Sequence, residues 1–307
     1  MSGAEIIDNA VWTSAAPRLS VLIPFFRDDP CRLIAALDRP AKPLEIVVLD
    51  DGSGDSALAD RVARTVRGLT TPARFVRLTR NEGRAAGRNR LAGEARSRHL
   101  LFLDSDMLPD ASDFLARWLT VIEAEDPAVA FGGFSLDQAP RTRANAVHRA
   151  LALRSDCLPV DVRRRTPEKY VFTSNLLIRR DVFETERFDT AFVGWGWEDV
   201  EWAMRVSRRH AILHIDNAAT HLGLAPAAAM AAKFEQSAAN FARVVAAHGD
   251  IVRAYPSYRV ARALKRVPLR SLWRPWLKTA ALFEAAPAGA RAFALRLYRA
   301  ALYAEAV

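Results

Sequence analysis

The sequence predicts an α/β fold in which helices flank a mostly parallel, doubly wound sheet, followed by a helical C-terminal extension. Short apolar runs alternate with stretches of helical spacing through the first third of the chain. This alternation favours parallel strands joined by right-handed crossovers. The chain has 307 residues, 50% of them hydrophobic, which suffices for one large core or two smaller ones. A disordered chain and a small disulfide-stapled scaffold are thereby excluded.

The elements of this sheet are expected in a regular order. Residues 19–26 form an apolar run suited to a strand buried on both faces, and Pro24 should mark its end, because proline cannot donate to a central ladder. Further strands are expected at residues 44–50, 75–78 and 100–103, with helices at 29–37, 55–67 and 84–96. Ligands of such sheets bind beyond the carboxyl ends of the strands. The ligand edge is therefore expected at residues 24–28, 50–55, 79–83 and 104–106.

The second half of the chain is less regular. Its expected elements are strands at residues 129–134, 170–178 and 211–215, a helix start at 180–184 and a helix at 198–209. Residues 141–165 are polar and poorly periodic, which predicts a loop with some helix. Residues 194–197 and 220–223 are expected to be loops.

The positive charge is concentrated at the C-terminal end. The chain has 44 Lys and Arg against 35 Asp and Glu, a net charge of +9. Residues 226–307 contain 13 Lys and Arg against 4 Asp and Glu, so they account for all of this excess. We expect an N-terminal segment (1–18), a catalytic domain (19–225) and a basic helical extension (226–307).

Several features bear on location. The two cysteines, Cys31 and Cys157, are too few for a disulfide framework or a four-thiolate zinc site. The N-terminus lacks the pattern of a signal peptide, and no apolar run reaches the ~18 residues of a membrane-spanning helix. These observations predict a cytoplasmic protein and leave open a peripheral position on the inner face of the cytoplasmic membrane.

Two carboxylates follow the strand expected at residues 100–103. Asp104 and Asp106 are one residue apart, so they project on the same side of an extended chain. Like charges at a sheet edge repel each other unless a cation lies beside them. Mg²⁺ and Mn²⁺ prefer such oxygen ligands and often share them with substrate phosphates. The alternative is an ordinary solvated turn.

Two further motifs fall at the same edge. Residues 50–54, Asp-Asp-Gly-Ser-Gly, offer a carboxylate for a base or ribose, or else a cap for the next helix. Residues 81–89 open a helix with small residues and two arginines, Arg84 and Arg88, which suits a diphosphate. A dehydrogenase is disfavoured, because the G-x-G-x-x-G fingerprint is absent from this stretch.

Taken in order, these motifs resemble glycosyltransferase family 2, whose members have the GT-A fold and use nucleotide sugars. The resemblance rests on residues 21–26, 48–53, 81–89 and 102–106. Residues 172–175 and the Gly-Trp-Gly-Trp-Glu-Asp run at 194–199 resemble the acceptor-side motif of galactosyltransferase-type relatives. The resemblance extends over residues 19–223.

The resemblance implies roles for individual residues. Asp51 would contact the uracil or ribose, Arg88 the nucleotide or diphosphate, and Asp104 the nucleotide side. The implied nucleotide-sugar-binding residues are Pro24, Phe26, Asp51, Arg84, Arg88, Asp104 and Trp197. Of Trp195 and Trp197, one is expected to form a platform beneath a sugar and the other to belong to the core.

A divalent cation, Mn²⁺ or Mg²⁺, is also implied, with Asp106 and His221 as its ligands. His214 is the rival histidine, but its strand position predicts a packing role. Asp199 matches the usual candidate for the general base, and Glu198 would orient hydroxyl groups. The alternative for Glu198 and Asp199 is a pair of ordinary acids in a first helical turn, favoured by the helix dipole.

The sequence therefore predicts a metal-dependent, inverting hexosyltransferase. It would move a sugar from a nucleotide-diphosphate sugar, such as a UDP sugar, to a hydroxyl of a glycan or lipid-linked acceptor. One alternative is a catalytically silent nucleotide-sugar-binding or scaffold protein of the same fold. Another is a sugar nucleotidyltransferase, although no glycine-rich phosphate loop with a nearby lysine follows the first strand.

The basic extension has three interpretations. Residues 251–278 contain eight Lys and Arg, no acid, two tyrosines and two tryptophans. This pattern is typical of an interfacial helix on an anionic membrane surface. A helical cap that packs on the catalytic domain is an equal alternative, and nucleic-acid binding is the least favoured one.

Overall fold

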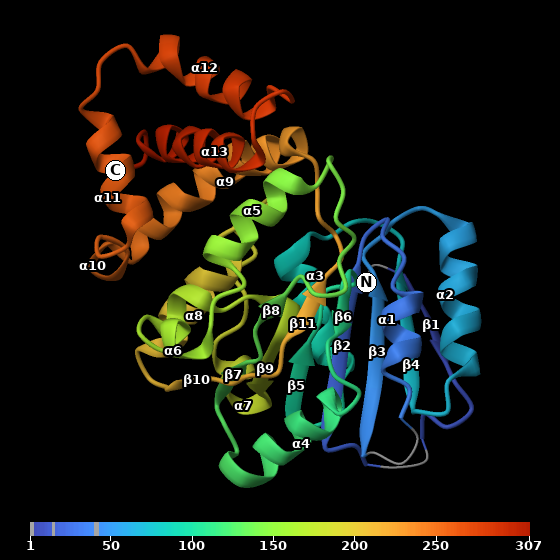
Figure 1. Cartoon of the computed structure of the whole chain (residues 1–307). Helices are drawn as coiled ribbons and strands as arrows, with labels where there is room; N and C mark the ends of the chain where they lie inside the picture. The colour runs from blue at the N-terminus through green and yellow to red at the C-terminus, as the bar shows by residue number, and fades with distance from the viewer. Residues whose placement is uncertain (1–2, 14–15, 40–42) are drawn as a thin grey trace.

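The computed structural model describes residues 3–13, 16–39 and 43–307. Its centre is an eight-stranded mixed sheet with the order β1-β4-β3-β2-β5-β9-β7-β10, and a three-stranded sheet, β6-β11-β8, lies beside it. Helices cover the large sheet, and the C-terminal helices form a separate layer at one end (Figure 1). The predicted α/β architecture with a helical C-terminal region is confirmed.

The parallel half of the large sheet follows the apolar runs of the sequence. It consists of β2 (Leu19–Phe25), β3 (Leu44–Asp50), β4 (Ala73–Leu78) and β5 (His99–Phe102). Pro24 is tolerated in β2 because the pairing with β5 already ends at Leu22. Since all four strands point the same way, their carboxyl ends meet at one edge.

Two apolar clusters cover the two faces of this sheet. One cluster contains side chains of α1 (Cys31–Ala36), α2 (Ser56–Gly68) and α4 (Phe114–Glu125). The other contains those of α3 (Arg84–Glu94), α7 (Arg180–Thr185) and α8 (Glu198–Ser207). Alternate residues of the strands belong to opposite clusters, as expected for strands buried on both faces.

The second half of the sheet contains antiparallel pairs. It is built from β9 (Leu176–Arg179), which runs antiparallel to β5 and to β7 (Val129–Phe131), and from β10 (Ile212–His214). The prediction of a strand at residues 170–178 is wrong for residues 170–175, because β9 begins only at Leu176. Two 3₁₀ turns, η1 (Pro167–Tyr170) and η2 (Thr173–Asn175), occupy this stretch. The Asn175 side chain donates to main-chain carbonyls of Gly133 and Asn217, which favours a turn over a ladder.

The small sheet corrects a second expectation. It contains β6 (Met107–Pro109), β8 (Phe134–Ser135) and β11 (Ala219–His221). The loop expected at residues 220–223 thus begins as a strand, and His221 pairs with Met107 of β6. Between these strands lie α5 (Ala146–Ser155) and α6 (Val160–Arg163), within the stretch where some helix was expected.

The segment before residue 19 contributes to the large sheet. Its strand β1 (Ala4–Asp8) runs antiparallel to β4, and Asp8 forms an ion pair with Arg74. Trp12 is buried, and the Arg74 and Arg96 guanidinium carbons lie 4.6 Å and 4.0 Å from its ring centre. A strand within residues 1–18, paired with the sheet of the 19–225 region, was not expected from the sequence.

The C-terminal extension packs on the rest of the chain. It consists of α9 (Ala227–Ala247), α10 (Gly249–Val252), α11 (Pro256–Lys265), α12 (Arg270–Leu282) and α13 (Ala288–Tyr303). One shared apolar cluster joins α9, α12 and α13 to α5, and another joins α9, α11 and α13 to α8. Over the ranges that the structure describes, no helix is long and apolar enough to span a bilayer.

Candidate active site

Asp106 and His221 meet at the carboxyl edge of the large sheet. Asp106 follows β5, whereas His221 ends β11, and the β6–β11 pairing brings them together. The His221 Nε2 atom lies 3.1 Å from Asp106 Oδ2. The Leu222 amide also donates to the Asp106 carbonyl at 2.8 Å, which fixes the backbone on both sides of the contact. The structure thus brings together the two residues expected to bind a metal.

The donor set fits a divalent cation that is shared with a ligand. A separation of 3.1 Å is close to that of neighbouring ligands around an octahedral ion with bonds of about 2.1 Å. Burial disfavours the charged form of Asp106, but the hydrogen bond and charge of His221 lower the pKa of this carboxyl below its usual value. Within the described part of the chain no three His, Cys, Asp or Glu side chains form a metal-binding group. An ion held by these two side chains would leave coordination positions open for phosphate oxygens and water.

Gly223 gives the Asp106 carboxylate its space. A Cβ atom on this glycine would lie 1.9 Å from Asp106 Oδ2, closer than any real contact allows. We expect Gly223→Ala to lower turnover by about 100-fold, because a displacement of about 1 Å in a catalytic group costs that much. Initial rates with saturating donor would measure the loss. Gly289→Ala is the matched control, since no atom lies within 4 Å of its added methyl. Unchanged turnover in Gly223→Ala would contradict this role of the glycine.

Two arginines and two carboxylates form a network at the start of α3. Arg84 donates from Nε to Glu198 at 2.6 Å, and Arg88 donates from Nη2 to Asp104 at 2.8 Å. The side chain of Arg84 is 41% exposed, whereas that of Arg88 is 2% exposed. Arg84 therefore faces the space where a ligand would bind. Arg88 lies beneath it and supports Asp104, which differs from the direct ligand contact expected from the sequence.

Asp199 has one carboxylate oxygen without a partner. Its Oδ2 accepts from the Thr173 amide at 3.0 Å and from the Thr173 hydroxyl at 3.2 Å. Its Oδ1 is buried and receives no hydrogen bond from the described residues. Burial, and then the negative charge of Glu198, raise the pKa of Asp199 to about 6. A carboxylate with these properties is suited to accept a proton near neutral pH.

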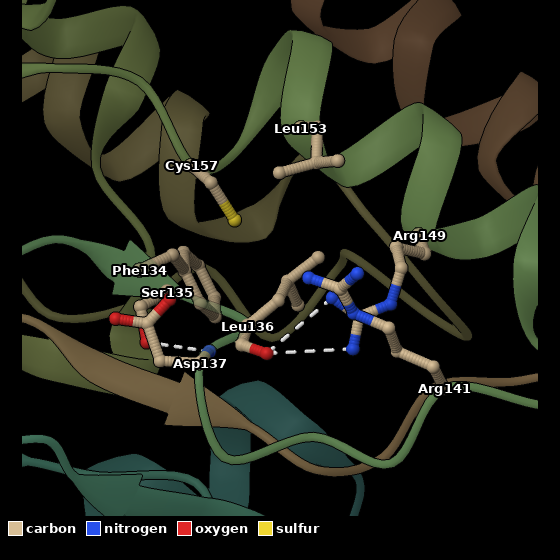
Figure 2. A pocket seen from close by; sticks show the side chains of 8 residues that line it. All are labelled: Phe134, Ser135, Leu136, Asp137, Arg141, Arg149, Leu153 and Cys157. Atoms are coloured by element: carbon tan, nitrogen blue, oxygen red, sulfur yellow. Dashed lines mark hydrogen bonds between the residues drawn. The ribbon is translucent and has the colours of Figure 1, made fainter.

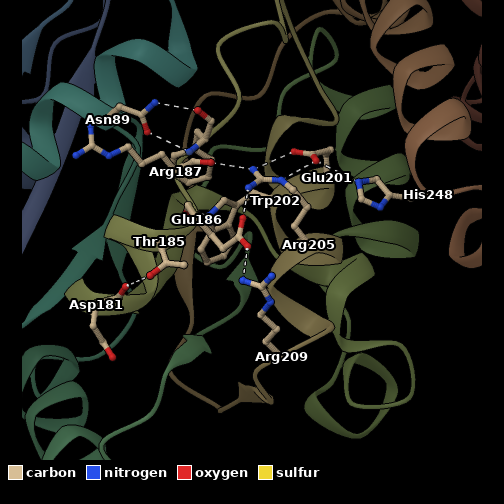
Figure 3. Close-up of polar contacts among 11 residues, drawn as sticks. Asn89, Asp181, Thr185, Glu186, Arg187, Glu201, Trp202, Arg205, Arg209 and His248 are labelled. Atoms are coloured by element: carbon tan, nitrogen blue, oxygen red, sulfur yellow. Dashed lines mark hydrogen bonds and ion pairs between the residues drawn. The ribbon is translucent and has the colours of Figure 1, made fainter.

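A second polar network holds α8 in place (Figure 3). The Trp202 indole donates to the Glu186 carbonyl at 2.6 Å. Arg205 forms ion pairs with Glu186 at 2.7 Å and with Glu201 at 2.8 Å. His248, which lies at the end of α9, contacts Glu201 at 3.1 Å. The helix that carries Glu198 and Asp199 is thus fixed from both the catalytic domain and the extension.

Asp51 holds the turn before α3. Its carboxylate accepts from the amides of Glu82 and Gly83 at 2.8 Å and 3.0 Å, and from the Asn81 side chain at 3.1 Å. Burial raises the pKa of Asp51 to about 6, although the two amide hydrogen bonds oppose this rise. Its contact with a nucleotide stays a prediction, because the structure accounts for both oxygens. The neighbouring Gly52 has a φ of +70°, and a Cβ there would lie 2.1 Å from the Arg80 backbone.

The loop after β2 lies at the same edge. Pro24 is half-buried near the end of β2, where it pairs with Leu49 of β3. Phe26 is 39% exposed, and the Arg27 guanidinium carbon lies 4.8 Å from its ring centre. An exposed ring of this kind can stack on a base. Asp28, which the sequence analysis did not single out, has its pKa raised by partial burial and by the charge of Asp106.

The two tryptophans of the 194–197 turn have different surroundings. Trp197 donates to the Tyr303 hydroxyl at 2.9 Å and packs 4.9 Å from the Phe241 ring, so its indole belongs to the contact with the extension. This placement argues against its expected role in sugar binding. Trp195 instead lies 5.8 Å from the ammonium group of Lys233, a residue of α9.

Lys233 is the main residue that sequence reasoning missed. Burial lowers its pKa, as does the charge of Arg84, while Asp106 and Asp28 oppose the shift, so the ammonium group lies within electrostatic reach of the acidic site. No local pattern marks it, because α9 brings it to the site only in the folded chain.

His214 has a structural position, with its ring between Arg163 and the Pro167 carbonyl.

A cavity of about 650 Å³ opens beside β8 and α5. Figure 2 shows Arg141 and Arg149 at one end of it and Asp137 at the other. Its wall residue Phe134 lies 5.8 Å from the His221 ring and 5.3 Å from Phe172, the neighbour of Thr173. Phe134 thus connects the cavity wall to His221 and to Phe172, while Asp106, His221 and Asp199 do not themselves line the cavity.

Comparisons with known proteins agree with this arrangement. The chain is similar to the mannosyltransferase PcManGT from Pyrobaculum calidifontis, whose structure contains GDP-Man and Mn²⁺, with 16% identity, 94% of this chain and 86% of that chain covered, and a TM-score of 0.57. It is also similar to S. aureus TarS 1-349 in complex with UDP-GlcNAc, with 16% identity, coverage of 94% and 90%, and a TM-score of 0.51.

These likenesses show the GT-A fold. No curated protein matches the chain. The family model described as Glycosyl transferase family 2 matches residues 20–186, which is more than half of the 307 residues. The chain therefore belongs to glycosyl transferase family 2 and is a glycosyltransferase.

Proposed function

We propose that this glycosyltransferase is a metal-dependent, inverting enzyme that transfers a sugar from a UDP sugar to a hydroxyl of a glycan or lipid-linked saccharide. The observation that supports this proposal most is that Arg84 lies within electrostatic reach both of Asp106, the contact partner of His221, and of Asp199. The nucleotide sugars in the two similar structures support a donor of this class. The likeness of residues 194–199 to a galactosyltransferase-type motif is part of the same proposal.

The donor would bind along the carboxyl edge. Phe26 would stack on the base, Asp51 would contact the uracil or ribose, and Asp104 would support the nucleotide. Asp106 and His221 would hold Mn²⁺ or Mg²⁺, which when bound neutralises negative charge on the diphosphate. Arg84 and Lys233 would stabilise the charge that develops on the leaving phosphate, because both are cations beside the acidic site.

The cavity beside Phe134, whose volume of about 650 Å³ suits a small saccharide, would hold a part of the acceptor away from its reacting hydroxyl, because Asp199 does not line the cavity. That hydroxyl would donate its proton to the free Oδ1 of Asp199 while its oxygen attacks the anomeric carbon. The bond from that carbon to the diphosphate oxygen breaks on the opposite side, so the configuration inverts. Glu198 holds Arg84 in place for this step.

Donor binding can be tested by a thermal-shift panel of nucleotide sugars. We expect a UDP sugar with Mn²⁺ to raise Tm by about 5 °C at 100 times its Kd, because ligands that bind only the folded state stabilise it. GDP sugars and Mn²⁺ alone are the controls. A panel in which no nucleotide sugar raises Tm would contradict the proposal, while binding without transfer or donor hydrolysis would favour the silent scaffold.

The pH dependence follows from the raised pKa of Asp199. We expect kcat/KM to rise about tenfold per pH unit below pH 6 and to level off above it, because only the ionised carboxylate accepts a proton. The profile should be measured with wild type and with Asp51→Asn, since the pKa of Asp51 is also about 6. If the acid limb persists in Asp51→Asn, Asp51 is not its source. A limb that is also unchanged in His221→Gln at saturating Mn²⁺ belongs to Asp199, and a flat wild-type profile would contradict the assignment.

A further inference from the structure

One face of α12 is apolar and exposed to solvent. Leu269, Leu272, Trp276 and Phe283 are 67%, 63%, 74% and 61% exposed. Leu272 and Trp276 lie four residues apart on one side of α12, and Leu269 and Phe283 directly flank its two ends. Six of the eleven large apolar side chains that are exposed in the described part of the chain fall between residues 260 and 283. We call these four residues the outer face of α12.

The outer face points away from the catalytic domain. The opposite side of the helix is held to the extension by Ala281, which is fully buried, and by the ion pairs of Arg274 with Glu305 and of Lys278 with Glu235. In Figure 1, α13 and α9 separate α12 from the sheet, and α12 lies at the periphery of the molecule. No side chain of the described residues therefore covers the outer face.

A row of arginines lies on the neighbouring helix. Arg259, Arg262 and Arg266 are exposed on α11 or at its end, at helical spacing, and none forms an ion pair with a described residue. Residues 251–278 contain no Asp or Glu at all. The exposed residues of α11 and α12 thus include guanidinium groups and bulky apolar side chains, and neither helix carries a carboxylate.

The two helices also border a shallow, open apolar hollow of about 220 Å³. Its lining residues are Leu264, Val267, Trp273, Leu277 and Leu297, from α11, α12, α13 and the turn between the first two. Val267 is itself 42% exposed, so the hollow borders the surface. Its lining is apolar throughout, so it offers contacts to hydrocarbon at the surface.

We propose that the outer face of α12 docks on an anionic lipid bilayer. The apolar side chains would enter the region between headgroups and acyl chains, and the arginines of α11 would contact the lipid phosphates. A second copy of the chain is a poorer occupant, because a twofold contact would bring the arginine row of one copy close to that of the other. The membrane-binding surface is thus smaller than the segment expected at residues 251–278. Tyr255 and Tyr258 do not belong to it, because they are buried against the catalytic domain.

The test is co-sedimentation of the full chain with vesicles of phosphatidylcholine, with and without 30% phosphatidylglycerol. We expect binding to the anionic vesicles that weakens at high salt. Leu272→Ser/Trp276→Ser should weaken it by at least about 10-fold. Reversal of the three arginines, Arg259→Glu/Arg262→Glu/Arg266→Glu, should weaken it by at least about 100-fold.

The control variants replace exposed apolar side chains and exposed arginines in other parts of the molecule. Ile6→Ser/Val193→Ser removes two exposed apolar side chains, and Arg64→Glu/Arg67→Glu reverses two exposed arginines of α2. Both controls should bind anionic vesicles within about twofold of wild type. The proposal is overturned if wild type binds neither vesicle, or if the α12 variant binds as well as wild type. It is also overturned if size-exclusion chromatography gives a dimer that Leu272→Ser/Trp276→Ser converts to monomer.

Discussion

Asp199→Asn is expected to lower kcat by about 10²–10⁴-fold while leaving donor affinity nearly unchanged. The substitution keeps the shape of the side chain and its contact with Thr173, but removes the negative charge that accepts the proton. The donor-side groups Asp104, Arg84 and Asp106 belong to other elements, so nucleotide binding should persist. Steady-state turnover and donor titration by calorimetry would separate the two quantities.

Glu198→Gln is the matched comparison, because it changes the adjacent carboxyl in the same way. Glu198 accepts from Arg84 at 2.6 Å and, unlike Asp199, has no fully buried oxygen that lacks a hydrogen-bond partner. Loss of the Glu198 charge releases Arg84, so the donor KM should rise. The effect on KM should exceed the effect on kcat. The assignment of the base is wrong if Glu198→Gln abolishes turnover and Asp199→Asn does not.

Removal of the divalent cation should abolish transfer. Cation stabilisation of a leaving phosphate contributes several kcal/mol, so chelation or Asp106→Ala is expected to lower the rate by at least about 1,000-fold. Mn²⁺ or Mg²⁺ should restore the wild-type enzyme after chelation, whereas Asp106→Ala and His221→Ala should bind Mn²⁺ weakly in calorimetric titrations. These two side chains supply the donor pair at 3.1 Å.

His210→Ala is a suitable control, because His210 lies just after α8 and away from the Asp106–His221 contact. It should bind Mn²⁺ like wild type and retain its turnover. Full activity of the wild-type chain in excess chelator would contradict the metal role of Asp106 and His221.

The sequence predicted the parallel half of the sheet because its signals are local. Runs such as residues 44–50 are apolar throughout, and the turn motifs after them mark the ligand edge directly. The antiparallel half was harder to predict. Strand β1 has only two large apolar residues and is stabilised by its pairing with β4, and the turns at 173–175 form because distant carbonyls accept from Asn175. Tertiary contacts of this kind leave no periodic pattern.

The candidate site divides in the same way. Asp106 and His221 could be paired through the family resemblance, although 115 residues separate them. Lys233 could not be assigned to the site from the sequence. It is one of several polar residues in the alanine-rich helix α9, and only the packing of that helix brings it to the site. The assignment of Trp197 rested on the motif alone, and the motif does not show that Tyr303 would bind its indole nitrogen.

Because the extension and the catalytic domain share two apolar clusters, we expect them to unfold together. Truncation after residue 225 would strip the partners from Val147, Leu151 and Met204, and would remove His248 from Glu201. The fragment would expose a broad apolar surface and lose support beneath its proton-accepting helix. Chimeras that exchange only the family-matched region between relatives would therefore need to carry their own C-terminal helices along with it.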